Sequence, residues 1–132
     1  MMIDSILLID DSKYDLFLAE DLIRDYCQVK EVVCVESAQK GLDYLKSKEN
    51  SPNELPQIIL LDIKMPFMDG FDFLNVYNTL SETIKENCKI YMLSSSLDPT
   101  DINKAKSNEN VIDFFEKPIT EENFNKMVSL FS

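Results

Sequence analysis

Five short runs of apolar residues, distributed along the whole chain, are the feature that most restricts its fold. They lie at residues 5–9, 29–35, 57–61, 89–93 and 111–115. Their apolar residues are continuous rather than alternating, which is typical of strands that are covered on both faces of a parallel sheet. None of the runs is long enough to span a bilayer. The pattern therefore predicts a buried parallel sheet.

The segments between these runs carry the spacing of helices. Apolar residues recur at intervals of three and four, which places them on one helix face. The stripes are Leu16, Ala19, Ile23 and Tyr26; Ala38, Leu42 and Leu45; Phe71, Leu74 and Tyr77; and Phe124, Met127, Val128 and Phe131. A short, weakly apolar helix is expected over residues 98–107, and residues 46–56 are expected to form a polar surface loop.

Residues that favour helix N-termini precede three of these segments. Ser37 and Thr120 are expected to cap the helices that follow them, and Asp98 is expected to cap the weak helix. Strand and helix then alternate five times. Because crossovers between parallel strands are right-handed, the expected fold is a three-layer α/β sheet with helices on both faces. The length is typical of one domain, so we predict a single domain over residues 1–132.

The composition excludes several classes of function. With 24 acidic and 13 basic residues, the net charge is −11, and such a surface repels phosphate backbones, so no nucleic-acid partner is expected. The chain has no histidine, which removes a histidine-based triad and the usual zinc sites. Its three cysteines lack CxxC spacing and are expected to be free thiols. Because the N-terminus lacks a secretory signal, a cytoplasmic protein without a membrane partner is expected.

Carboxylates follow two of the apolar runs directly. Asp10 and Asp11 end the first run, and Asp62 ends the third. In an open α/β sheet the chemistry lies beyond the C-terminal ends of the strands, so these three carboxylates are expected to meet. Their mutual repulsion would raise the pKa of one of them, and an oxygen-seeking cation relieves it. Mg²⁺ is the expected ion, because it binds through few carboxylates and keeps several waters.

Two more strand ends complete a site for a phosphoryl group. Ser94 offers a hydroxyl after the fourth run, and Lys117 offers an ammonium group after the fifth. Phosphoryl transfer needs positioning and charge neutralisation more than covalent catalysts. Asp62, held at the rim by its buried strand, is the best placed nucleophile. In the loop that follows, Gly70 is expected to take a backbone conformation that other residues resist.

These motifs resemble those of the receiver domains of two-component response regulators over essentially the whole chain. The resemblance rests on Asp10-Asp11 after Leu-Leu-Ile, and on Asp62 within the pattern D-x-x-M-P-x-x-D-G. It also rests on Ser94 after Tyr-Met-Leu and on the Lys117-Pro118 pair. It implies a flavodoxin-like, doubly wound (βα)5 fold whose five parallel strands have the order 2-1-3-4-5. The similarity is to stand-alone, single-domain receivers of the chemotaxis-regulator type.

The resemblance implies roles for the acidic residues. Asp62 would be the phosphoacceptor. Mg²⁺ would bind Asp11, Asp62 and the backbone carbonyl of Lys64, and Asp10 would hold a metal-bound water.

It also implies a route for the signal. Ser94 and Lys117 would bind the phosphoryl oxygens, and Phe114 falls at the position of an aromatic switch residue. Once phosphorylation draws the Ser94 hydroxyl away, Phe114 would turn inward and reshape the surface between the helix over 98–107 and the last helix. In residues 108–110 an asparagine, in place of the frequent glycine, is expected to adopt the left-handed conformation of a helix end.

The implied function is that of a phosphorylation-dependent signalling switch and not of an enzyme, apart from self-catalysed phosphotransfer and autodephosphorylation. A sensor histidine kinase or a histidine phosphotransfer protein would donate the phosphoryl group. A downstream target protein would bind the face between the helix over 98–107 and the last helix.

Two alternatives stay open. Small hydrolases of the haloacid-dehalogenase type share the nucleophilic aspartate after an apolar strand, but their D-x-D pattern would require an acid where this chain has Lys64. A degenerate receiver would act as a constitutive docking module, and the intact acids, Ser94 and Lys117 argue against it.

Overall fold

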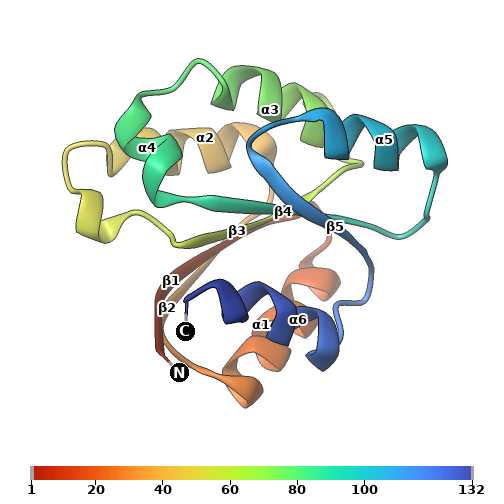
Figure 1. Cartoon of the computed structure of the whole chain (residues 1–132), viewed down its shortest axis with the longest axis horizontal. Coiled ribbons are helices and arrows are strands. Elements are labelled where there is room, and N and C mark those ends of the chain that lie inside the picture. Colours follow the sequence, from red (N-terminus) through yellow and green to blue (C-terminus); the bar gives the residue numbers. More distant parts are fainter. Residues whose placement is uncertain (1, 132) are drawn as a thin grey trace.

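The chain folds around a parallel, five-stranded sheet (Figure 1). The computed structural model describes residues 2–131. The strands are β1 (Met2–Ile9), β2 (Gln28–Val35), β3 (Ile58–Asp62), β4 (Lys89–Ser94) and β5 (Val111–Glu116). All neighbouring pairs are parallel, and their order is β2-β1-β3-β4-β5. The predicted flavodoxin-like fold and its strand order are confirmed.

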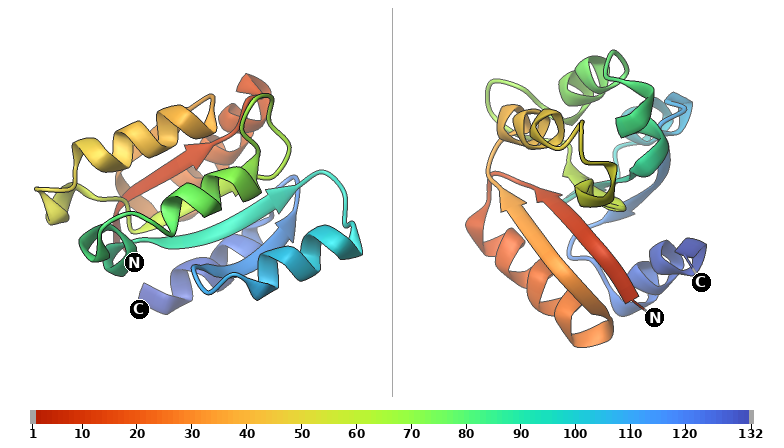
Figure 2. Two further views of the ribbon diagram at one scale, coloured as in Figure 1. Left: turned by 90° about the horizontal axis from the view of Figure 1, so that it is seen from above. Right: turned by 90° about the vertical axis from the view of Figure 1, so that its left-hand side faces the viewer.

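Helices cover both faces of the sheet. They are α1 (Lys13–Tyr26), α2 (Ala38–Ser47), α3 (Gly70–Tyr77), α4 (Glu82–Asn87), α5 (Pro99–Ser107) and α6 (Glu121–Val128). The first and last lie on one face and the other four on the opposite face, as Figures 1 and 2 show from three directions. The side chains of Ser37, Asp98 and Thr120 cap their helices as predicted. Among the described residues, no helix is long and apolar enough to cross a membrane.

The expected strict alternation of strand and helix is wrong at one point. The short helix α4 is inserted between α3 and β4. The hydroxyl of Ser81 caps it by accepting a hydrogen bond from the Ile84 amide, and the Ile84 side chain is fully buried in the core. One buried residue is too few to produce a periodic stripe, which is why the sequence pattern did not reveal this helix.

Burial is uneven across the sheet. Every residue of β3 is buried, whereas β2 has only exposed and half-buried residues and half of β5 is exposed. The prediction that all five runs are covered on both faces is therefore wrong for the two edge strands, which have a neighbour on one side only. Two smaller expectations are wrong as well. Tyr26 at the end of α1 is exposed, and the polar loop over residues 46–56 contains the buried Leu55.

Candidate functional site

Three carboxylates meet at the C-terminal ends of β1 and β3, as expected from the sequence. Asp10 follows β1 and Asp62 ends β3; both are buried, whereas Asp11 is exposed. One oxygen from each of the three carboxylates lies within 4.8 Å of the others. The cause is the register of the sheet: Ile9 is paired with Leu61, so the residues that follow these two emerge side by side.

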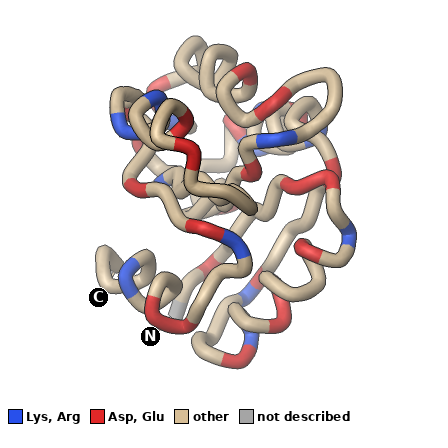
Figure 3. The backbone as a smooth tube through the Cα atoms, turned by 90° about the vertical axis from the view of Figure 1, so that its right-hand side faces the viewer, with Lys and Arg blue, Asp and Glu red and all other residues tan. Residues whose placement is uncertain are grey.

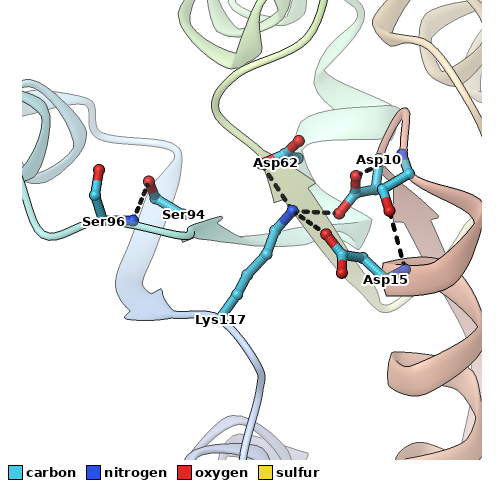
Figure 4. A network of polar contacts seen from close by, with 7 residues as sticks. Asp10, Asp15, Asp62, Ser94, Ser96 and Lys117 are labelled. Carbon is cyan, nitrogen blue, oxygen red and sulfur yellow. Dashed lines mark hydrogen bonds and ion pairs between the residues drawn. The ribbon is translucent and has the colours of Figure 1, made fainter.

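The ammonium group of Lys117 lies beside two of these carboxylates and beside a further one, that of Asp15 (Figure 4). Its Nζ is 2.6 Å from Oδ2 of Asp10, 3.0 Å from Oδ2 of Asp15 and 3.1 Å from Oδ1 of Asp62. Lys117 follows β5, two strands away from Asp62, and its amide donates a 2.7 Å hydrogen bond to the Ser94 carbonyl. That bond fixes the start of the loop from which the side chain reaches back across the end of β4.

The charges within the site are unbalanced. Burial raises the pKa of Asp62 to about 6; the charge of Asp10 adds to the rise, and Lys117 opposes it. Burial also acts to lower the pKa of Lys117, but the hydrogen bond to Asp10 and the charges of Asp62 and Asp10 outweigh it and raise that pKa. Beside the effect of burial on Asp62, the carboxylates of Asp10, Asp11 and Asp62 outnumber the ammonium group of Lys117, and their mutual repulsion acts in the same direction. A divalent cation relieves this repulsion, so the oxygen-rich donor set fits Mg²⁺.

The loop between β3 and α3 folds back against the backbone of Asp62. The Gly70 amide donates to the Ile63 carbonyl at 2.8 Å. A Cβ atom on Gly70 would lie 2.6 Å from the carbonyl oxygen of Asp62 and 3.0 Å from Cα of Ile63. Gly70 does not have a positive φ, so the expectation of an unusual backbone conformation is wrong. The residue has to be glycine because two backbone segments approach closely there.

The positive φ of this loop belongs to Phe67 instead, at 68°. The Met68 amide donates to the Pro66 carbonyl at 2.8 Å, which closes a γ-turn centred on Phe67. The Phe67 side chain is fully exposed, so it contributes nothing to the core. A γ-turn at a phenylalanine has no signal in propensity or periodicity, which is why the sequence did not reveal it.

Ser94 and Lys64 lie where strand ends should place them. Ser94 ends β4, is buried, and its Oγ accepts a 3.2 Å hydrogen bond from the Ser96 amide (Figure 4). Lys64 follows Asp62 by two residues and its side chain is exposed.

Phe114 lies on β5 and packs in the core cluster on the side of α2 to α5. The residue is 9% exposed. The side chain is buried in this conformation, and its movement on phosphorylation stays a prediction.

The expected left-handed asparagine after α5 is wrong. Phe67 is the one non-glycine residue with a positive φ among residues 2–131. Asn108 ends α5 with φ −90° and ψ 122°, and its Oδ1 accepts a 2.9 Å hydrogen bond from the Asn110 amide. The side chain itself closes this turn, so no left-handed residue is needed.

Asp15 belongs to the site, although no pattern in the sequence indicated it. It lies in the first turn of α1, and its carboxylate contacts Lys117, which is 102 positions further along the chain. An acidic residue in the first turn of a helix is ordinary, because the helix dipole favours it there. The only signal in the sequence is that this turn directly follows Asp10 and Asp11.

Comparison with known proteins points to one family. Residues 6–129 match the sequence profile of the family described as "Response regulator receiver domain". The chain is 27% identical over 124 residues to "Two-component response regulator ORR1" of rice (Oryza sativa subsp. japonica), a match that covers 92% of this chain and 52% of that protein. The chain thus spans about half the length of this relative. It is 26% identical over 123 residues to "Probable methanogenesis regulatory protein FilR2" of Methanothrix harundinacea, covering 93% of this chain and 77% of the relative.

Solved structures agree with the family match. A two-component response regulator from Cytophaga hutchinsonii superposes with a TM-score of 0.92 at 32% identity, covering 98% of this chain and 97% of the other. A response regulator receiver protein from Dyadobacter fermentans gives a TM-score of 0.85 at 30% identity, covering 99% and 98%. The chemotaxis protein CheY4 of Vibrio cholerae shares the fold, with a TM-score of 0.75 at 20% identity over 97% of this chain and 98% of the other.

Proposed function

The chain belongs to the response regulator receiver family, and from that membership we propose that it is a signalling switch controlled by phosphorylation of Asp62. The observation that carries the proposal is the position of this side chain. Asp62 is buried at a strand end, 3.1 Å from the ammonium group of Lys117, with two further carboxylates beside it. With a pKa of about 6, its carboxylate is mostly ionised at neutral pH and able to act as a nucleophile.

In the proposed reaction, an oxygen of the Asp62 carboxylate attacks the phosphorus of the donor. A phosphorus–oxygen bond to Asp62 forms while the bond to the leaving group breaks, and the electron pair of that bond leaves with the donor. Lys117 binds a phosphoryl oxygen through its ammonium group, and the Ser94 hydroxyl, which lies at the end of β4, donates to another. The self-catalysed transfer and the later hydrolysis of the acyl phosphate are the only reactions we assign to this chain.

The same carboxylates are proposed to hold Mg²⁺. Asp11, Asp62 and the Lys64 carbonyl would be the ligands, and Asp10 would hold a bound water. The ion would supply positive charge next to the phosphoryl oxygens. The support from the structure is the cluster of three carboxylates and the raised pKa of Asp62.

Replacing Asp11 tests the metal assignment. We expect Asp11→Ala to weaken Mg²⁺ binding by at least about tenfold, since Mg²⁺ sites depend on one or two carboxylates. Asp11 is exposed, so its removal leaves the core intact. The measurement is a titration of the folded protein with MgCl₂, followed by NMR shifts around Asp62. Asp21→Ala removes an exposed carboxylate of α1 that contacts none of the cluster, and it should bind like wild type. Equal affinities for Asp11→Ala and wild type would place the ion elsewhere.

The function itself is tested by intact mass after incubation with acetyl phosphate and Mg²⁺. We expect wild type to gain the mass of one phosphoryl group and Asp62→Asn to gain none. A gain that persists in Asp62→Asn would reject Asp62 as the acceptor. Steady turnover of a phosphate ester, without a stable phosphoprotein, would favour the hydrolase alternative. No mass gain in the wild type would favour the constitutive docking module.

The partners follow from the proposed reaction. A sensor histidine kinase or a histidine phosphotransfer protein would supply the phosphoryl group. We propose that a target protein reads the state of the site at the face formed by α5, β5 and α6. On this face, Ile112 of β5 offers an exposed apolar side chain.

A further inference from the structure

The number of hydrogen bonds that the ammonium group of Lys117 can donate limits how many partners it binds. A lysine ammonium group has three N–H donors. In this structure three different carboxylates lie within 3.1 Å of Nζ, those of Asp10, Asp15 and Asp62 (Figure 4). A phosphoryl oxygen therefore gains a bond to Lys117 only when one of these carboxylates gives up its own.

The three carboxylates differ in how easily they can be released. The side chains of Asp10 and Asp62 are 9% and 7% exposed, whereas that of Asp15 is 37% exposed. Releasing a buried carboxylate leaves an unpaired charge away from water, which is costly. A released Asp15 carboxylate is rehydrated instead. Asp62 carries the incoming group and loses its own charge, so its contact with Lys117 passes to a phosphoryl oxygen. For any further phosphoryl oxygen that binds Lys117, Asp15 is the partner released at the lowest cost.

The position of Asp15 favours release for a second reason. It lies in the first turn of α1, where the positive end of the helix dipole stabilises a carboxylate without any lysine. Its backbone amide donates to Oγ of the N-cap residue Ser12, and the Ser12 amide donates to Oδ1 of Asp10. These hydrogen bonds hold the backbone of Asp15 next to the site, so Asp15 stays there after its side chain has released Lys117.

We propose that Asp15 is a positioning residue that holds Lys117 in the unphosphorylated protein and competes with the phosphoryl group for it. This inference rests on the proposed function of Asp62. Asp15 acts in two ways in the same direction: it occupies one donor of Lys117, and its negative charge opposes an incoming group that carries about −1.5 to −2 at neutral pH. Figure 3 shows that acidic positions outnumber basic ones along the backbone, in keeping with the net charge of −11.

The test uses beryllofluoride, which mimics a phosphoryl group on a carboxylate, in saturating Mg²⁺. We expect Asp15→Asn, which keeps the size and removes the charge, to bind beryllofluoride about threefold to fivefold more tightly than wild type, the upper part of the range for losing a partly exposed ion pair. Asp15→Glu restores the charge and should bind like wild type. Asp21→Asn removes the same charge from the same helix at an exposed position away from Lys117, and it should stay within about twofold of wild type.

A second measurement reports on Lys117 directly. The side-chain ¹⁵N signal of Lys117 in the free protein should move in Asp15→Asn, stay in place in Asp21→Asn, and return towards its wild-type position in Asp15→Glu. Thermal unfolding of each variant shows whether its fold is intact.

The outcomes separate the two proposals. Equal or weaker binding by Asp15→Asn overturns the role of Asp15, as does an equal gain in Asp15→Asn and Asp21→Asn, which would show a general effect of charge. If wild type does not bind beryllofluoride at all, the proposed function of Asp62 fails first. Tighter binding confined to Asp15→Asn, with the Lys117 signal displaced, supports the competition.

Discussion

Asp62→Asn is expected to stabilise the protein by about 2 kcal/mol at pH 7.5 without Mg²⁺, although it removes the proposed phosphoacceptor. Burial and the charge of Asp10 raise the pKa of Asp62 from 3.8 to about 6. A rise of this size corresponds to about 3 kcal/mol of stability that the folded protein loses when Asp62 ionises. This figure already includes the attraction between Asp62 and Lys117, so the variant recovers most of it, less the cost of burying an amide in place of the carboxyl group. Lys117 keeps Asp10 and Asp15 as partners, so the substitution leaves no unpaired buried charge.

The pH dependence gives this prediction a definite sign. Because the folded protein binds the Asp62 proton more tightly than the unfolded chain, Asp62 contributes stability below pH 3.8, and this contribution is lost as the pH rises through about 6. The advantage of Asp62→Asn should therefore be small near pH 4 and complete above pH 7. Saturating Mg²⁺ should reduce it, because a bound cation relieves the same repulsion in wild type.

Urea unfolding in a chelating buffer between pH 4 and pH 8 measures this effect. Asp21→Asn provides the matched control, since it removes an exposed carboxylate with the same change in charge. Its stability should follow that of wild type at every pH. A destabilised Asp62→Asn at pH 7.5 would show that the ion pair with Lys117 outweighs the burial and crowding of Asp62.

Gly70→Ala is expected to lower the free energy of unfolding by about 3 kcal/mol, at the upper end of the usual cost of overpacking. The added Cβ would lie 2.6 Å from the Asp62 carbonyl oxygen and 3.0 Å from Cα of Ile63. Both atoms belong to the backbone at the end of β3, in the centre of the sheet, so they cannot move aside as a side chain can. Relief of the clash would displace Asp62, so the variant should also accept a phosphoryl group from acetyl phosphate more slowly.

Gly41→Ala is the control for this prediction. Its Cβ would meet Cδ1 of Ile9 at 2.5 Å, which is the end of a flexible side chain. Gly41 lies inside α2, where alanine favours the helix by about 1 kcal/mol over glycine and offsets the cost of moving Ile9. We expect its stability to stay within about 1 kcal/mol of wild type in the same urea experiment. Equal losses in both variants would mean that the contact with the Asp62 backbone has no special importance.

The sequence by itself determined the architecture and the acidic part of the site. Continuous apolar runs predict a parallel sheet, and the order of strands and helices leaves few ways to connect it. Asp10, Asp11 and Asp62 directly follow or end such runs, so the rule that parallel strands end at one edge brings them together. Each of these predictions depends on local periodicity or on a strand end, and both can be read from a single sequence.

The tertiary structure alone decided the features that depend on contacts between distant segments. Only the fold shows that Asp15 shares Lys117 with Asp10 and Asp62, because the pair is 102 positions apart and an acid in the first turn of a helix is unremarkable. Only the fold shows that Gly70 is required by the close approach of the Asp62 backbone and not by its own φ. Propensity and periodicity describe each residue with its neighbours in the chain, whereas these contacts arise from how loops from separate strands pack at one edge of the sheet.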